Sequence, residues 1–538
     1  MNKLKRIILA VLVCSVCTTY AQTNKSATFE AFKKNSKTSV LPDYSWAGYK
    51  MGTVGIPDVK GKIFDVSKYG ALPNDSLEDF DGVQAAIKAA EAAGGGIVFF
   101  PKGRFLINEK EGRRDGIVIS KPNIILRGSG SGADGTEIFM KHYMLPKDPE
   151  KKWTVPAMFT FNYYKGSSAK SVILHNAKRG VFKIVVEDAS TFKTGDYISL
   201  KMQNPAANPE FLDNLDTWNI WKTTNEKGVQ IIEKHKIAKI EENEITLCEP
   251  LCTNITASYN WKVEGIVLAE GLGVEDIWFR GNFKEIVVHH KNFIHDAGWT
   301  FLSMGRTANG FIRRIRMTDI STGISIGNGY ACTMTDIRFE GNPGHSMLSA
   351  TNSYGVLIAN VTDATNAPGM WHGPCSANSS CNTVIWRYKG QARSGPDFHA
   401  SWPYCTLVDA STCKYIGNGG NYELLPNHLK DLTYWNVKQI GKFEKVDFWE
   451  PQLYDNSNDQ QNKFYGKFVK IVKPNIIGMY GDSISFIKEH LGIYESHGKP
   501  VTPESLYEAQ LELRLGKLPK WVETSKKDSE LNLKNLKK

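Results

Sequence analysis

Long apolar runs are almost absent from the 538-residue sequence. The one compact run, residues 7–13, is too short to span a membrane, because a spanning helix needs about 20 apolar residues. It follows three basic residues, and the small-x-small sequence of residues 19–21 comes after it. This order is typical of a cleaved export signal. We therefore predict a signal peptide over residues 1–21, a secreted or periplasmic protein, and no membrane span.

Cysteine is scarce and does not occur at zinc-ligand spacing. Nine cysteines are present, and two of them lie in the predicted signal. The other seven are Cys248, Cys252, Cys332, Cys375, Cys381, Cys405 and Cys413. An odd number without metal-site spacing argues against a disulfide framework and a structural zinc. We expect buried thiols, and one or two surface disulfides are the alternative in an oxidising compartment.

Clustered positive charge is missing outside the tail of residues 517–538. The formal net charge of +10 falls to +7 when the three basic residues of the signal are removed. A basic exported protein can bind nucleic acid, membrane headgroups or an acidic polysaccharide. Because the charges are dispersed and export is predicted, we expect an acidic polysaccharide as the partner and no nucleic acid. We expect the chain to be a monomer.

A short apolar pattern recurs through residues 310–441, and Gly, Asn, Asp or Ser follows each copy. Its first positions, spaced by 22, 24, 26, 23 and 25 residues, are Ile312, Met334, Ile358, Val384, Leu407 and Leu432. A period near two dozen residues with β-branched residues and turn formers predicts stacked strands. We predict an all-β protein, a right-handed parallel β-helix whose coils bury their apolar side chains against one another. A sandwich of hairpins is the alternative, but it needs no constant period.

The rest of the chain divides into segments around this repeat. A strand, a helix beginning after Asp79 or Asp81, and a Gly-rich exit at residues 94–96 open the ordered part. Such a helix closes the open end of a solenoid, whose last coil would otherwise expose its core. The predicted division is an N-terminal extension (22–60), a cap with the first coils (61–150), a small β insertion (151–265), the β-helix core with the active-site groove (266–445), and C-terminal strands, helix and basic tail (446–538).

The N-terminal block carries a family resemblance. Residues 64–71 (FDVSKYGA), 83–87 (VQAAI) and 94–105 (GGGIVFFPKGRF) resemble the N-terminal cap of the pectate-lyase-like β-helix superfamily. The resemblance implies the parallel β-helix fold. It does not imply one reaction, because lyases, hydrolases, epimerases and phage tailspikes are built on this fold.

Three histidines recur at nearly the period of the coils. His345, His372 and His399 are 27 residues apart, and Asn421 and Glu423 follow about one coil later. Stacked coils place such side chains along one sheet face about 5 Å apart. Because charged histidines in a row repel one another, a groove floor explains the row better than structural histidines in the core do. Further candidates for the groove are Trp371, Arg393, Asp397, Tyr404 and, from the loop of residues 283–299, His289, His290 and Lys291.

The side chains of this groove favour β-elimination of a uronate sugar. That reaction needs a cation to neutralise the carboxylate, a base for the C5 proton and an acid for the leaving oxygen. Histidine, lysine, tyrosine and arginine can supply these roles. A glycoside hydrolase needs two carboxylates instead, and the intact motifs of polygalacturonases are missing, with Gly344-His345-Ser346 as the nearest match.

We assign roles on this basis. His372 or His399 removes the C5 proton, Arg393 binds the carboxylate, and Tyr404 protonates the leaving oxygen. The expected substrate-binding residues are His345, His289, His290, Lys291, Asn421, Glu423 and Trp371. We expect no cofactor; Asp397 and Glu423 would hold Ca²⁺ if calcium took the place of arginine, although the acids are few for an oxygen cage.

The motifs around these residues are similar to those of exported bacterial β-helix proteins of the pectate-lyase-like group. The similarity includes His289-His290, Gly344-His345, Asp397-Phe398-His399 and Gly419-Gly420. Some proteins of this group are polysaccharide lyases that cut uronate sugars, glycosaminoglycans among them, so the resemblance favours a lyase. We predict an exported lyase of an acidic polysaccharide, with chondroitin or hyaluronan ahead of pectin and alginate. A glycoside hydrolase on the same fold and a non-catalytic carbohydrate-binding solenoid are the alternatives.

Overall fold

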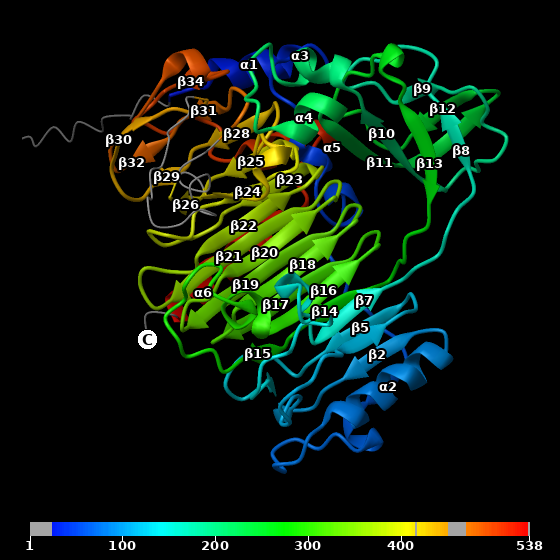
Figure 1. Cartoon of the computed structure of the whole chain (residues 1–538), viewed down its shortest axis with the longest axis vertical. Coiled ribbons are helices and arrows are strands. Elements are labelled where there is room, and N and C mark those ends of the chain that lie inside the picture. The colour runs from blue at the N-terminus through cyan, green and yellow to red at the C-terminus, as the bar shows by residue number, and fades with distance from the viewer. Residues whose placement is uncertain (1–23, 415–416, 450–469, 536–538) are drawn as a thin grey trace, which may run out of the picture.

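The computed structural model describes residues 24–414, 417–449 and 470–535. These residues are mostly β, in long sheets of parallel strands that stack along the molecule, as in a β-helix (Figure 1). Hairpins would pair antiparallel, so the sandwich alternative is wrong for these sheets. The predicted signal peptide lies outside the described residues. Within them, no helix is long and apolar enough to cross a membrane.

Two parallel sheets form the main walls of the coils in the described residues. The first has 15 strands: β1 (Ile63–Asp65), β2 (Gly96–Phe99), β3 (Gly103–Leu106), β5 (Ile124–Arg127), β6 (Thr136–Phe139), β14 (Gly273–Glu275), β15 (Trp278–Arg280), β17 (Phe311–Thr318), β19 (Thr333–Gly341), β21 (Leu357–Thr365), β23 (Cys381–Trp386), β25 (Tyr404–Asp409), β28 (Leu432–Trp435), β31 (Asn475–Ile477) and β34 (Tyr494–Glu495). The second has eight: β4 (Ile117–Ile119), β7 (Phe159–Asn162), β16 (Thr300–Gly305), β18 (Thr322–Gly327), β20 (Ser346–Thr351), β22 (His372–Ala377), β24 (Asp397–His399) and β27 (Gly417–Gly419). Shorter parallel pairings add β26 (Thr412–Cys413), β29 (Lys438–Gln439), β32 (Tyr480–Gly481), β30 (Phe443–Val446) and β33 (Ile484–Phe486).

The register of the first sheet follows the apolar repeat with two displacements. The predicted neighbours that do pair are Ile312 with Met334, Met334 with Ile358, and Val384 with Leu407. Ile358, however, pairs with Ile385 rather than Val384, and the pairing after Leu407 is displaced by one residue in the same way. Both β23 and β25 are buried on both faces. Apolar side chains do not alternate in such strands, so the sequence pattern cannot fix their register.

A helix closes the N-terminal end of the coils. Helix α2 (Phe80–Ala92) buries Val83, Ile87 and Ala90 against the first strands (Figure 1, blue). Asp79 precedes the helix, but its carboxylate does not cap it and instead accepts a hydrogen bond of 2.7 Å from the backbone N–H of Leu106. The residue thus ties the cap helix to the first coil.

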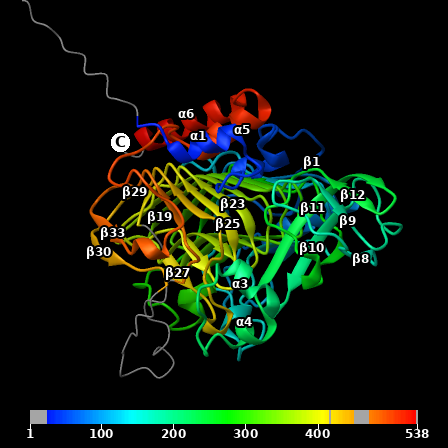
Figure 2. The same cartoon turned by 90° about the horizontal axis from the view of Figure 1, so that it is seen from above.

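An antiparallel sheet interrupts the coils between residues 170 and 266. Its six strands are β8 (Lys170–Val172), β13 (Lys262–Ile266), β10 (Tyr197–Gln203), β11 (Gln230–Glu241), β12 (Glu244–Leu247) and β9 (Lys183–Val185), and two short helices accompany it, α3 (Asn208–Phe211) and α4 (Lys222–Lys227). Strand β7 still belongs to the parallel coils, although the predicted insertion began before it. The inserted sheet packs on one side of the coils, where Arg179 forms an ion pair of 3.2 Å with Asp431 (Figure 2).

The two ends of the described chain meet on another side of the coils. Helices α1 (Ala27–Lys34), α5 (Leu506–Leu515) and α6 (Lys520–Asn535) lie on the same side of the molecule (Figure 2). Asp409, at the end of β25, accepts hydrogen bonds of 3.0 Å from the N–H groups of Leu506 and Tyr507 at the start of α5. A carboxylate at this place caps the helix and complements its dipole.

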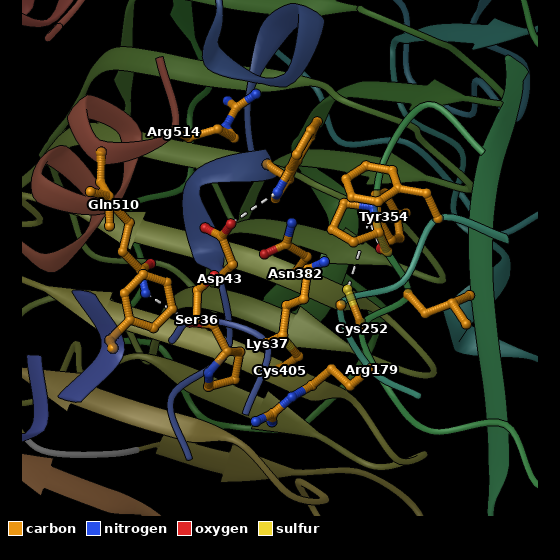
Figure 3. A pocket seen from close by; sticks show the side chains of 18 residues that line it. Ser36, Lys37, Asp43, Arg179, Cys252, Tyr354, Asn382, Cys405, Gln510 and Arg514 are labelled. Atoms are coloured by element: carbon orange, nitrogen blue, oxygen red, sulfur yellow. Dashed lines mark hydrogen bonds between the residues drawn. The ribbon is translucent and has the colours of Figure 1, made fainter. Parts of the chain in front are cut away.

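A pocket of about 230 Å³ lies where these parts meet. Its labelled lining comes from the N-terminal extension, the inserted sheet, the coils and α5 (Figure 3). Asn382 lines it and is fully buried, with Tyr354 and Cys405 nearby. None of the predicted catalytic histidines lines this pocket.

Candidate active site

Three strand ends of the second sheet carry the predicted row of histidines. His345 immediately precedes β20, His372 begins β22 and His399 ends β24. The ring centroids of His345 and His372 are 5.1 Å apart, and those of His372 and His399 are 6.0 Å apart. The three do not occupy equivalent register positions, because His372 pairs with Ser346 and His399 with Ala377. Their rings nevertheless form one cluster.

Asp397 is a buried carboxylate shared by two of these histidines. Its Oδ2 lies 3.1 Å from Nδ1 of His399 and 3.4 Å from Nδ1 of His372. Burial raises the pKa of Asp397, but the charges and hydrogen bonds of both histidines outweigh it and hold that pKa well below its ordinary value. Burial lowers the pKa of His399, yet the hydrogen bond and charge of Asp397 bring it above its ordinary value of 6.5. Asp397 therefore fixes Nδ1 of His399 as the donor and leaves Nε2 as the basic nitrogen.

The two histidines differ in their access to solvent. The side chain of His399 is 37% exposed, whereas that of His372 is 7% exposed and its Nε2 faces Nε2 of His289 at 3.3 Å. Gly419 of β27 pairs with His399, and a Cβ there would lie 2.2 Å from Cε1 of the imidazole. Because Gly419 has no side chain, the imidazole of His399 fits beside it. Of the two histidines, His399 is the one that a substrate can reach.

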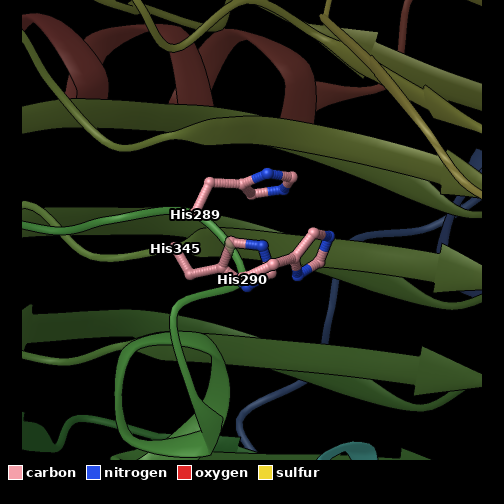
Figure 4. Close-up of side chains that lie close together, drawn as sticks. All are labelled: His289, His290 and His345. Atoms are coloured by element: carbon pink, nitrogen blue, oxygen red, sulfur yellow. The ribbon is translucent and has the colours of Figure 1, made fainter. Parts of the chain in front are cut away.

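The loop of residues 283–299 adds two more imidazoles. The His289 ring lies 3.7 Å from that of His290 and 5.2 Å from that of His345, measured between centroids. Figure 4 shows these three rings gathered between the loop and the strands. His289 also stacks on Trp371 at 4.9 Å with an interplanar angle of 10°. Five histidines from one loop and three coils thus meet at this site.

Asp296 holds the loop histidines in place. It lies in the short π-helix of residues Ile294–Gly298, and its carboxylate accepts a hydrogen bond of 3.0 Å from the backbone N–H of His290. Nδ1 of His290 lies 3.0 Å from Oδ2 of the same carboxylate, and the carbonyl oxygen of Asp296 accepts from Nδ1 of His345 at 3.1 Å. One residue therefore orients imidazoles from both the loop and the coil.

Two histidines of the cluster, His289 and His345, are held neutral. Burial, together with the neighbouring imidazoles, lowers the pKa of His289 to about 3 and that of His345 to about 3. Within the described residues, Nε2 of His345 is buried and has no hydrogen-bond partner. The site thus holds a basic imidazole beside Asp397 and neutral imidazoles further in.

Arg393 supplies positive charge beside the cluster. Nε and Nη2 donate to the carbonyl oxygen of Gly369 at 3.1 and 2.6 Å, and the guanidinium lies 5.0 Å from the Trp371 ring centroid. Among the described residues, no carboxylate forms an ion pair with Arg393 within 4.0 Å. Its charge is therefore available to an anionic ligand.

Tyr404 lies outside the cluster, which corrects its predicted role as proton donor. It is 3% exposed, sits at the start of β25 in the first sheet, and its hydroxyl donates to the carbonyl oxygen of Ile232 in the inserted sheet at 3.3 Å. Burial raises its pKa well above the ordinary value. The inserted sheet covers this hydroxyl, so Tyr404 cannot protonate a substrate.

Across the residues that the structure describes, three predicted binding residues, Asn421, Glu423 and Lys291, form no hydrogen bond or ion pair with the clustered histidines, and the predicted calcium pair does not come together. Oδ1 of Asn421 accepts a hydrogen bond of 2.9 Å from the backbone N–H of Glu423. Both residues lie in a short turn that follows Gly419, the strand neighbour of His399. Lys291 is exposed and forms an ion pair of 3.1 Å with Glu285. No group of candidate ligand atoms in the described residues joins Asp397 to Glu423, so their predicted use for Ca²⁺ is not supported. Asp397 already serves two imidazoles and is enclosed.

Two features escaped the interpretation of the sequence. Asp397 was considered for calcium and not as the partner of two histidines, although its place two residues before His399 puts both on one face of a strand. The other is Cys375, which pairs in register with Asp397. Burial and the charge of Asp397 raise the pKa of this thiol well above its ordinary value, so it stays protonated. No sequence motif signals that contact.

Comparison with known proteins finds a family model that is similar to part of the chain. Residues 369–525, which include His372, Arg393, Asp397 and His399, match the family model "Domain of unknown function (DUF4955)". Mannuronan C5-epimerase AlgE3 of Azotobacter vinelandii is 41% identical over 69 residues, which are 13% of this chain and 4% of the epimerase. Alginate lyase 7 of the same organism is 38% identical over 69 residues, 13% of this chain and 8% of the lyase.

The similarity to curated relatives is confined to a segment, which spans 4% to 12% of their lengths. Among solved structures, the tailspike protein gp49 from Pseudomonas phage LKA1 has a TM-score of 0.46 at 12% identity, over 78% of this chain and 71% of that one. The A-module of Azotobacter vinelandii mannuronan C-5 epimerase AlgE4 has a TM-score of 0.36 at 13% identity, over 78% of this chain and 89% of that one.

Proposed function

We propose that this protein removes the C5 proton of uronate residues in an acidic polysaccharide and cleaves the chain by β-elimination. One observation carries the proposal: a half-exposed imidazole, His399, is hydrogen-bonded through Nδ1 to the buried Asp397. This pairing leaves Nε2 as a base that a substrate can reach. The carboxylate raises the basicity of the ring and keeps its tautomer fixed.

The elimination balances with the residues at hand. Nε2 of His399 takes the proton from C5, the electrons of that C–H bond form the C4–C5 double bond, and the bond from C4 to the glycosidic oxygen breaks. The leaving oxygen needs one proton. The imidazolium of His399, formed in the first step, returns it, so a separate tyrosine donor is not needed. Asp397 stabilises the imidazolium in between.

Arg393 neutralises the uronate carboxylate. Proton abstraction beside a carboxylate builds negative charge on it, and a guanidinium stabilises that charge through directed hydrogen bonds. Trp371 holds the guanidinium from one side and Gly369 accepts two of its bonds, which fixes its direction.

The substrate class follows from the relatives and from charge. The names of the matching proteins refer to alginate and mannuronan, so we place alginate first. The chondroitin and hyaluronan favoured from the sequence have no support among these relatives. The positive formal charge suits any polyuronate. Export through the predicted signal would bring the protein to such a polymer, and periplasmic or secreted location, as well as a monomeric state, belongs to this proposal.

C5 epimerisation is the second candidate, because most of the matching relatives are named mannuronan C5-epimerases. An epimerase must remove the C5 proton from one face of the sugar and deliver another proton to C5 from the opposite face without breaking the chain. Glycoside hydrolysis fits less well, because it requires two carboxylates of which one is protonated. The two carboxylates described at this site, Asp397 and Asp296, are both paired with histidines, which outweigh the effect of burial and lower their pKa values, so neither is held as the protonated acid.

One incubation separates these candidates. The protein is mixed with polymannuronate in D₂O, and the product is followed by ultraviolet absorbance and by NMR. A lyase gives unsaturated uronate ends, an epimerase incorporates deuterium at C5 without chain cleavage, and a hydrolase gives new reducing ends that are saturated. His399→Ala serves as the matched negative. The protein is also tested on other polyuronates, including pectin, hyaluronan and chondroitin. If none of them is changed, a non-catalytic carbohydrate-binding solenoid is the function that remains.

A further inference from the structure

The side-chain nitrogen atoms of three clustered histidines point to a metal ion. Ligand atoms of His289, His290 and His345 all lie within 4.8 Å of one another (Figure 4). We propose that these three imidazoles bind a divalent transition metal of the zinc class, in a site with an open coordination position beside His372. The family model matches residues 369–525 and so includes none of these three histidines.

The tautomers leave nitrogen lone pairs for the metal. Nδ1 of His345 donates to the carbonyl oxygen of Asp296, which makes Nε2 the unprotonated nitrogen, and that Nε2 is buried and unpartnered in the described part of the chain. Nδ1 of His290 is paired with the Asp296 carboxylate, so its Nε2 is also left to a ligand. The carbonyl behind His345 and the carboxylate behind His290 are the arrangement that proteins use to orient metal-binding histidines. A buried nitrogen without a hydrogen-bond partner costs free energy, and a bound ion would remove that cost.

The spacing is close to that of a coordinated ion. Nitrogens bound tetrahedrally to one zinc at 2.0–2.1 Å are about 3.4 Å apart. Nε2 of His289 and Nε2 of His372 are already 3.3 Å apart, so the open position borders His372. The ligand atoms of the three proposed ligands lie within 4.8 Å of one another, so to bind one ion they need to close by no more than the difference from about 3.4 Å. Asp296 contacts His290 through its carboxylate and His345 through its carbonyl oxygen, so one residue orients both imidazoles.

The donor set selects the class of metal. Calcium prefers six to eight oxygen ligands, and the three proposed ligands offer only nitrogen. Imidazole suits zinc, cobalt, nickel and copper, and three histidines with one open position are the donor set of a catalytic zinc. The open position could take a substrate carboxylate, a use that rests on the proposed function. Binding of the ion itself does not rest on it.

The test measures metal binding without polysaccharide. Tag-free protein is stripped with a chelator, dialysed, and titrated with Co²⁺ and Zn²⁺, with metal content measured by mass spectrometry and Co²⁺ followed by its visible spectrum. We expect one Zn²⁺ per chain, displacement of Co²⁺ by Zn²⁺, and no displacement by Ca²⁺. We expect loss of stoichiometric binding in His290→Gln, whose side chain is 53% exposed and can change without disturbing the core. Asp296→Asn should weaken binding by about 10–100-fold, as outer-shell partners do.

Matched controls decide the location. His175→Ala removes an exposed histidine of the inserted sheet and should bind metal as the unaltered protein does. Absence of stoichiometric binding in the unaltered protein overturns the proposal, and so does binding that survives both His290→Gln and His345→Gln. Circular dichroism and thermal unfolding of each variant show whether it is folded. If the metal binds but its removal leaves polysaccharide cleavage unchanged, the site stands and only its catalytic use fails; if it binds and no polyuronate is altered, the proposed function fails and the site still stands.

Discussion

Nδ1 of His399 lies 3.1 Å from Oδ2 of Asp397, and this pair determines how activity should depend on pH. His399 must be neutral to take a proton, and Asp397 raises its pKa above the ordinary value of 6.5. The rate therefore falls as pH decreases through that raised pKa. In Asp397→Asn the negative charge is gone, so the pKa of His399 decreases and the acid limb of kcat/KM moves to lower pH. The plateau should also fall, because a less basic imidazole is a weaker catalyst.

The measurement is kcat/KM against pH for the unaltered protein, Asp397→Asn and a control. Asp213→Asn makes the same carboxyl-to-amide change at a surface ion pair with Lys473 and should leave the profile in place. His399→Ala should lose about 10²–10⁴ in rate, the usual contribution of a general base. An acid limb that does not move in Asp397→Asn would show that another group titrates.

Gly419 should be needed for activity more than for folding. Its φ lies outside the left-handed region, so alanine is compatible with the backbone, but the new Cβ would lie 2.2 Å from Cε1 of His399. The imidazole must rotate away from Asp397. We expect Gly419→Ala to reduce kcat strongly and to remove the raised pKa of His399, measured by NMR titration of the imidazole. Gly327→Ala is the matched control, because Gly327 lies in β18 of the same sheet and a Cβ there meets nothing within 4 Å.

Much of the fold and part of the site could be predicted from the sequence. The apolar period gave parallel coils, and histidines 27 residues apart do meet, because coils of nearly constant length return the chain to the same sheet. Exact register could not be predicted where β23 and β25 are buried on both faces. Tyr404 was wrongly placed in the groove because the cover over it comes from Ile232, far away in the sequence. The role of Asp296 depends on the fold of a loop, which no periodicity describes.

Arg393 should act on substrate affinity and on the rate together. Arg393→Lys keeps the charge but cannot donate to Gly369 from two nitrogens and still present a planar edge to a carboxylate. A hydrogen bond to a charged group is worth about 1.5–3 kcal/mol, so kcat/KM should fall by about 10–100-fold. For Arg393→Ala, kcat/KM should fall further. Steady-state kinetics with polymannuronate measures this fall. A binding measurement with a neutral polysaccharide, which has no carboxylate, checks the reason, because its affinity should not change.

His235 should make stability depend on pH, independently of the active site. It is fully buried in the inserted sheet, with Nδ1 2.9 Å from Glu249 and Nε2 3.0 Å from Glu233. Burial lowers its pKa, but the two carboxylates outweigh this and raise the pKa to about 10 from an ordinary value of 6.5. Because the folded pKa is raised, the stabilisation is fully present below about pH 6.5 and is lost as pH rises through about 10.

His235→Gln removes the charge and leaves two buried carboxylates without their cation, which costs about 3–5 kcal/mol in such pairs. Chemical unfolding of the two proteins, followed from pH 6 to pH 10.5, should show a large difference in the free energy of unfolding at low pH that shrinks as the pH rises. His175→Ala, an exposed histidine of the same insertion, should change stability by no more than about 0.5 kcal/mol. A difference that stays constant across this range would mean that His235 is neutral when folded, and that the sheet holds together through packing rather than through this buried triad.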